Sequence, residues 1–403
     1  MSSPAAAPSA RAPRSGPGAP RSGGRSPLPG CESTERAADG TGRHPSPGAE
    51  RRAPATHGAR PALLIAAVLV ILLALCVASL AIGSRPVPPS TVLRVLLDTV
   101  THLGGGGSGA RAGSLGLSVQ DYAAVSDLRL PRTAIALLAG AALGLAGGLI
   151  QSLTRNPMAE SGILGLNAGA AFAVALAITV LGITSPAGFV WFALLGAFVG
   201  TVAVWLIGTA GGMVSPERLT LAGVALGAVL AGITSAMRLT NPQRFSALLV
   251  WESGDLSQRG WSLVVPALPF LAIGVVLALL LAPGMNLLAL GDDLAVAAGA
   301  HLLRIRVLMV LAITLLAGAA TVMAGPISFV GLMAPHVARW IVGPDQRRLL
   351  PLAMAISAAV MLVADVLARV ILWPSEVPAG IVAAVVGAPV LIVLVRRTRA
   401  SGL

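Results

Sequence analysis

Residues 130–151 read LPRTAIALLAGAALGLAGGLIQ, and no charged residue lies between Arg132 and Arg155. A bilayer core about 30 Å thick needs about 20 mostly apolar residues for each helical span. The stretch therefore predicts a transmembrane helix. Small residues let neighbouring helices approach closely inside a membrane, so plain packing is enough to explain its four glycines, Gly140, Gly144, Gly147 and Gly148.

Apolar segments of similar length recur along the chain. Of its 403 residues 55% are hydrophobic and only 11% are charged, with a mean hydropathy of +0.84, so a water-soluble fold is excluded. We expect an all-α polytopic membrane protein with about ten transmembrane helices, at 63–82, 133–153, 163–182, 187–208, 219–239, 262–282, 305–324, 328–343, 351–372 and 379–395.

Residues 1–60 differ from the rest in composition. They are rich in Pro, Gly, Ala and Arg and carry almost no large apolar side chains, which predicts a disordered tail. Residues 61–403 then form one transmembrane domain. Its first apolar run is too long and too deep in the chain for a usual signal peptide, so we interpret it as a retained span.

All 28 basic residues are arginine, and the chain contains no lysine. A P-loop needs a lysine on the nucleotide phosphates, so this chain cannot hydrolyse ATP by that motif. The net charge of +12 does not indicate nucleic-acid binding, because no basic stripe alternates with aromatic residues. No set of residues is typical of a catalytic or metal site. We therefore expect no enzyme activity and no cofactor bound by this chain.

The distribution of arginines predicts an orientation. With both termini in the cytoplasm, the cytoplasmic loops hold six arginines: Arg155, Arg218, Arg304, Arg306, Arg347 and Arg348. Several others then face outward against this tendency: Arg129, Arg132, Arg238, Arg244 and Arg259. Outward arginines need compensating contacts.

Several ordered motifs resemble the FecCD family, the permeases of iron-siderophore and cobalamin ABC importers, over about residues 65–397. They are RNPMAESGILGLNAGA at 155–170, LAGVALG at 221–227, WESGDLSQRGW at 251–261, LGDDLAVAAG at 290–299, AGPISFVGLMAPHVAR at 324–339, ADVLAR at 364–369, EVPAGI at 376–381 and GAP at 387–389, besides the segment at 130–151. The resemblance implies the type II ABC importer permease fold.

The resemblance also implies partners and a place in the cell. Cytoplasmic ABC ATPase subunits would use ATP, an extracytoplasmic substrate-binding lipoprotein would deliver the ligand, and a second copy or a homologous permease would complete a dimer in a bacterial plasma membrane. A ferric siderophore is favoured over cobalamin or haem by the GLNAG stretch at 165–169. One alternative is an ion-coupled secondary transporter, for which Asp365 is almost the only candidate ionisable group; another is a membrane scaffold.

Two cytoplasmic regions are candidates for coupling and gating. Residues 290–306 favour short helices that a motor domain could grip, with Gly291, Asp292, Ala295, Ala298 and Gly299 as contact positions; an interfacial amphipathic helix is the alternative. A turn is predicted at Arg155-Asn-Pro. In the family the corresponding loop helps to close the exit, which makes Asn156 and Met158 candidate gate residues. The loop before the fifth predicted span would be the other gate segment and adds Pro216 and Glu217.

The outward ends of two spans carry the remaining candidates. Asp365 and Arg369 are four residues apart on one helix face, so they can form an intramembrane ion pair. The family implies that Arg129, Arg132 and Arg369 receive acidic residues of the binding protein, while contact with lipid headgroups is the alternative. His336 lacks a second ligand at metal-binding spacing and is interpreted as structural.

Overall fold

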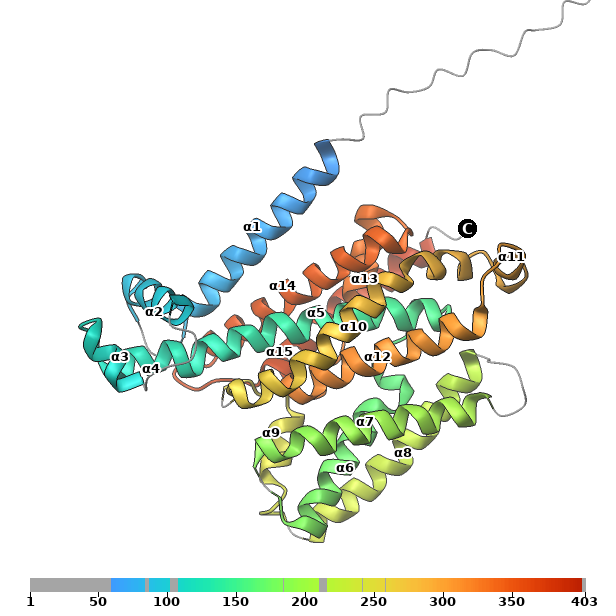
Figure 1. Ribbon diagram of the computed structural model, residues 1–403. Coiled ribbons are helices and arrows are strands. Elements are labelled where there is room, and N and C mark those ends of the chain that lie inside the picture. Colours follow the sequence, from blue (N-terminus) through green and yellow to red (C-terminus); the bar gives the residue numbers. More distant parts are fainter. Residues whose placement is uncertain are drawn as a thin grey trace, which may run out of the picture. The chain divides into compact units, whose positions relative to one another are not determined.

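The computed structural model describes residues 59–83, 87–101, 108–183, 185–209, 216–240, 242–257 and 259–400 (Figure 1). The predicted tail of residues 1–60 lies outside these ranges except for its last two residues, which begin the first helix. Within the described ranges the secondary structure is helical. The helices are α1 Ala59–Ala81, α2 Pro89–Thr101, α3 Ser108–Ser114, α4 Val119–Ala123, the π-helical η1 Ala124–Arg129, α5 Leu130–Thr154, the 3-10 turn η2 Ser161–Leu164, α6 Leu166–Leu181, α7 Pro186–Thr209, α8 Pro216–Thr240, α9 Ser246–Glu252, α10 Trp261–Leu288, α11 Asp292–Ala297, α12 Leu302–Ala324, α13 Val330–Val342, α14 Gln346–Val370 and α15 Ala379–Ala400.

Each predicted span overlaps one of these helices. Among the described residues, 7 helical segments are long and apolar enough to cross a membrane, and three shorter apolar helices accompany them at 166–181, 330–342 and 379–393. The chain is therefore a multi-pass membrane protein. With 13 residues, α13 is about 20 Å long, which is shorter than the hydrocarbon core. It is mostly buried against α5 and α14 instead of spanning alone.

Helix α5 lies at the centre of the bundle, in contact with α10, α12, α13 and α14. Its glycines make these contacts close. A Cβ atom at Gly144 would lie 2.5 Å from the carbonyl oxygen of Ala353 in α14, and one at Gly147 would lie 1.7 Å from that of Gly331 in α13. Only hydrogen fits between the backbones at these points. The prediction that small residues allow close packing is confirmed.

Helices α6, α7 and α8 pack on one another and lie beside this central group, with α12 in contact with α7 (Figure 1). Side chains along α8 remain largely exposed on the isolated chain. Helix α1 is more exposed still, and its main packing partner is α14.

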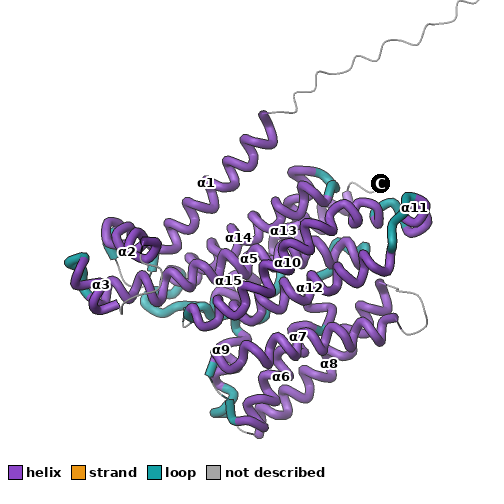
Figure 2. The backbone as a smooth tube through the Cα atoms, in the orientation of Figure 1, coloured by secondary structure: helices purple, strands orange, loops and turns teal. Residues whose placement is uncertain are grey.

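Among the non-helical segments of the described residues (Figure 2), two lie next to the short helices η2 and α13. One includes residues 155–160 between α5 and η2; the other is 325–329 between α12 and α13. In the second, Gly325 and Ile327 are buried. Buried backbone polar groups must be paired, so the bundle has to supply hydrogen-bond partners for the second segment.

Candidate functional sites

The charged side chains of the bundle gather at two ends. At the arginine end, α1 and α14 finish and α5 begins; Arg129, Arg132 and Arg369 lie there. At the coupling end, α5 and α10 finish and α12 begins, next to α11. The three predicted docking arginines are thus brought together at one end, and the predicted coupling segment lies at the other.

Asp365 is the buried centre of the arginine end. Its side chain is 0% exposed and accepts from Arg132 Nε at 2.7 Å and from Arg369 Nη2. Arg132 also donates from Nη1 to Glu376 Oε2 at 2.5 Å. The Asp365 carboxylate therefore offsets part of the positive charge of two guanidinium groups. Glu376 contributes a second carboxylate, which is partly exposed.

Two of the arginines also hold the end of α1. Arg129 Nη1 donates to the carbonyl oxygens of Leu80 and Ala81 at 2.9 and 3.1 Å, and Arg369 Nη1 donates to those of Ser79 and Ile82 at 2.6 and 2.9 Å. The last carbonyls of a helix lack partners within it and carry partial negative charge. The two arginines therefore compensate the partial negative charge at the end of α1.

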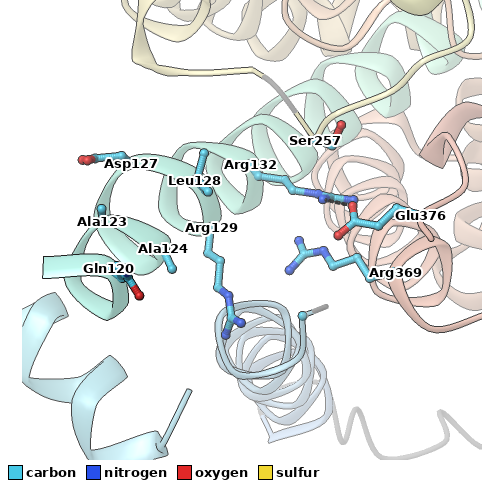
Figure 3. Close-up of a pocket in the computed structure, with 11 residues that line it drawn as sticks. Gln120, Ala123, Ala124, Asp127, Leu128, Arg129, Arg132, Ser257, Arg369 and Glu376 are labelled. Atoms are coloured by element: carbon cyan, nitrogen blue, oxygen red, sulfur yellow. Dashed lines mark hydrogen bonds and ion pairs between the residues drawn. The ribbon is translucent and has the colours of Figure 1, made fainter. Parts of the chain in front are cut away.

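A cavity of about 580 Å³ opens beside this cluster (Figure 3). Figure 3 shows Arg132 directed toward Glu376, while Arg129 is directed toward the end of α1. All three arginines line the cavity, although each is at most 6% exposed. The lining residues are Gly83, Gln120, Ala123, Ala124, Asp127, Leu128, Arg129, Arg132, Ser257, Arg369 and Glu376.

Two other arginines that the sequence predicts to face outward also have partners within the chain. Arg238, in the last turn of α8, pairs with Glu252 in α9. Arg259 donates to the carbonyl oxygens of Met323 and Trp251 at 2.8 and 3.0 Å, close to the C-terminal ends of α12 and α9. Main-chain carbonyls at helix ends therefore compensate several of the arginines that oppose the positive-inside tendency.

Asp292 is the centre of the coupling end. Its carboxylate accepts from Arg155 at 2.5 Å and from Arg306 at 2.8 and 2.9 Å, and it is 42% exposed. Burial raises the pKa of Asp292, but hydrogen bonds and charge from Arg306 and Arg155 outweigh that effect and leave its pKa below the usual value. The coupling segment is thereby tied to the end of α5.

The predicted contact positions in this segment differ in accessibility. Ala295 is fully buried and packs inside the chain, so it cannot meet a partner, whereas Ala298 and Gly299 are exposed. Gly291 and Gly299 have φ angles of 102° and 82°, which favour glycine irrespective of any docking. Three apolar side chains of this segment that were not among the predicted contact positions are exposed on its surface. They are Leu290, Leu294 and Val296, which are 59%, 61% and 57% exposed.

The candidate gate loop, residues 155–160, begins at Arg155 in a left-handed conformation with φ of 49°. Asn156 Oδ1 accepts from the Met158 amide at 2.9 Å and so shapes the predicted turn. On α13, His336 Nε2 lies 2.8 Å from the carbonyl oxygen of Pro157.

Glu217 is exposed in the first turn of α8, after Pro216, and η2 packs on α8 just beyond the gate loop. Across the described ranges, no group of three His, Cys, Asp or Glu side chains is placed to hold a metal ion.

Comparison with known proteins decides the class of this chain. The model of the FecCD transport family matches residues 71–397. This chain belongs to the FecCD transport family. The match extends from within α1 to within α15, so it covers all the candidate sites described above.

FecCD relatives match over most of their own length. The chain is 43% identical to the ferric enterobactin transport system permease protein FepD of Escherichia coli over 343 residues, which are 85% of this chain and 97% of the relative. It is 42% identical to the Fe(3+) dicitrate transport system permease protein FecC of the same species, over 68% of this chain and 83% of FecC. An inward-facing metal-chelate type ABC transporter superposes with a TM-score of 0.70 at 26% identity, covering 84% of this chain and 99% of that one.

A further residue of the FecCD motif at 155–170 was missed. Glu160 Oε1 accepts the Phe329 amide at 2.9 Å, joining the two irregular segments across 169 positions of sequence. In the sequence it is one acid in a polar loop, and nothing near it predicts a partner in the segment before α13. Only the three-dimensional contact identifies it.

Proposed function

We propose that this chain is the membrane-spanning permease subunit of a binding-protein-dependent ABC importer that carries a ferric siderophore into the cytoplasm. The observation that supports it most is the 43% identity to the ferric enterobactin permease over 97% of that protein. Separate cytoplasmic ATPase subunits hydrolyse the ATP, since a P-loop lysine cannot come from a chain without lysine.

The transport test uses vesicles that contain the permease with the ATPase and binding protein encoded beside it. We expect uptake of iron-labelled ferric enterobactin or ferric citrate that requires internal ATP, with cobalamin and haem as poor competitors. Uptake that continues without ATP and stops when ion gradients are collapsed would instead favour the ion-coupled alternative. Strong competition by cobalamin or haem would instead identify that ligand as the transported substrate.

In this proposal the arginine end faces outward and docks the binding protein. The cavity wall formed by Arg129, Arg132 and Arg369 offers guanidinium groups to carboxylates of the partner. Arg129 is the best probe, because it is not one of the two arginines that bind the buried carboxylate of Asp365.

We expect Arg129→Gln, which keeps a donor for the α1 carbonyls but removes the charge, to weaken binding-protein affinity several-fold at low salt and less at moderate salt, since salt screens charge pairs at an interface. The matched control is Arg94→Gln on the exposed face of α2. Equal losses of affinity in both variants would mean that net charge alone causes the effect, and the assignment of Arg129 to docking would be wrong.

The coupling end then faces the cytoplasm, where residues 290–306 meet the ATPase and the gate loop and the start of α8 close the exit. A second permease covers the exposed apolar side chains of α8, among them Leu221, Val224, Val229 and Ile233. Single-cysteine labelling of intact cells tests the orientation at exposed positions of the two ends. We expect Ser114→Cys to react from outside and Arg348→Cys only after permeabilisation.

A further inference from the structure

The two irregular segments of the bundle are joined by one side chain. Glu160, at the end of the gate loop, accepts the amide hydrogen of Phe329 at 2.9 Å. Phe329 immediately precedes α13, so the carboxylate lies at the N-terminal end of this 13-residue helix. Unpaired amides and the helix dipole both favour an anionic acceptor at that position.

The backbone that Glu160 holds is strained. Phe329 has φ of 70° and ψ of −32°, although it is not glycine, and the Val330 amide bonds to the Ser328 carbonyl two residues back at 2.9 Å. This is a γ-turn of the rare positive-φ type. A bulky residue keeps such a conformation only when its surroundings enforce it. The Glu160 carboxylate fixes the amide of the strained residue itself.

A second contact places the gate loop along α13. His336, seven positions beyond Phe329, lies with Nε2 at 2.8 Å from the Pro157 carbonyl oxygen. The loop therefore touches α13 at two points about 10 Å apart along the helix axis. Helix α13 in turn packs on α5 through Gly331 and Gly147, so any motion of α13 relative to α5 would reach the loop.

We propose that Glu160 is a positioning residue that latches the gate loop to the start of α13, so that the two move as one body when the exit opens and closes. The inference rests on the proposed transport function and adds a residue to its gate. Loss of the latch frees the loop and lets the Phe329 turn relax, which uncouples ATP hydrolysis from passage of the substrate.

Three substitutions separate the parts of this interaction. Glu160→Gln keeps the length of the side chain and an acceptor oxygen but removes the charge. Glu160→Asp keeps the charge but is one methylene shorter, so it cannot reach the Phe329 amide without movement of the backbone. Glu160→Ala removes both. The matched control is Thr154→Val, which removes a nearby buried hydroxyl that donates only within α5, to the Ile150 carbonyl.

The first measurement is ferric enterobactin uptake per ATP hydrolysed in the reconstituted importer, with folded protein quantified by size-exclusion chromatography. We expect uptake per ATP to fall in the order Glu160→Gln, Glu160→Asp, Glu160→Ala. The Ala variant should be at least about tenfold below wild type, and Thr154→Val should be unchanged. Equal or higher coupling in Asp than in Gln would overturn the latch. That outcome would instead mean that the charge itself, as in proton transfer, is what transport needs.

The second measurement does not depend on any transported ligand. In a background with Cys31 and Cys76 replaced, Met158→Cys reports on the gate loop through its rate of thiol labelling in detergent; Met158 is 41% exposed. We expect labelling several times faster with Glu160→Ala and little changed with Glu160→Gln. Unchanged labelling in the Ala variant would contradict the latch even if transport were normal. If wild-type vesicles moved no ferric siderophore, the proposed function would fail while this measurement still tested the latch.

Discussion

The two ends of the bundle contain the same charged unit in different surroundings. At the arginine end, Asp365 lies between Arg132 and Arg369 and is 0% exposed. At the coupling end, Asp292 lies between Arg155 and Arg306 and is 42% exposed. Each is one carboxylate shared by two guanidinium groups.

Burial gives the two units different consequences. A buried ion pair is costly to break because the remaining charge has no water, whereas an exposed pair contributes about 1 kcal/mol or less. We infer that the unit at Asp365 holds α1, α5 and α14 together. The unit at Asp292 can open and close at little cost, which is compatible with the coupling role proposed for this segment.

The largest predicted effect tests that difference directly. Asp365→Ala leaves Arg132 and Arg369 without their shared carboxylate and should cost about 3–5 kcal/mol, enough to remove most folded protein. Asp292→Ala should cost about 1 kcal/mol or less. Folded yield and thermal unfolding in detergent measure both. Similar unfolding temperatures for the two variants would show that burial does not make the loss of Asp365 more costly than the loss of Asp292.

The same reasoning changes the expectation for Arg369. Its side chain is 2% exposed and binds Asp365 as well as carbonyls of α1, so charge reversal there would place two carboxylates side by side in the bundle. We expect Arg369→Glu to lose folded protein before its docking can be measured. Arg129 is therefore the better docking probe.

A second prediction sharpens the comparison at the coupling end. Burying a leucine side chain stabilises a complex by about 1.5–3 kcal/mol, so Leu294→Arg should weaken ATPase binding roughly 10–100-fold while sparing the fold. The matched control is Val119→Arg, which changes an apolar side chain that is 52% exposed at the arginine end. Co-purification of the ATPase with each variant is the measurement. Equal loss in both would point to general damage and not to an interface.

Much of the fold could be predicted from apolar length alone, because the membrane requires long apolar helices. The prediction worked least well where the chain is short or irregular. Residues 328–343 were predicted as a span, whereas α13 has only 13 residues, is mostly buried and follows a strained turn. Apolar composition does not distinguish a helix buried in protein from one that crosses lipid.

The candidate sites were predictable in position but not in partners. The positive-inside tendency identified Arg129 as unusual, yet its partners are main-chain carbonyls of α1, which have no sequence signal. Spacing predicted that Asp365 and Arg369 could pair. The contact of Arg132 with Asp365, 233 positions away, depends on how α5 packs on α14. Glu160 was missed for the same reason.

The smallest predicted effect concerns the start of α14 at the coupling end. Asp345 caps this helix by accepting from the Arg347 amide at 3.1 Å, and Asn286 Nδ2 donates to it at 2.7 Å. Loss of such a cap costs about 1 kcal/mol, so Asp345→Ala should unfold slightly earlier than wild type at pH 7. The control is Asp293→Ala in the exposed first turn of α11, which should change stability less.

The pH dependence of this cap has a definite sign. The Asn286 hydrogen bond, helped by the Arg347 amide and nearby arginine charges, holds the pKa of Asp345 below its usual value. A depressed pKa in the folded state adds stability above the unfolded pKa of about 3.9, and that stability is lost as the pH falls further through the folded value. The difference between Asp345→Ala and wild type should therefore be constant near neutral pH and shrink below about pH 4. Thermal unfolding at pH 7 and at pH values below 4 measures it, and a difference that grew on acidification would show that Asp345 is not stabilised as an anion in this cap.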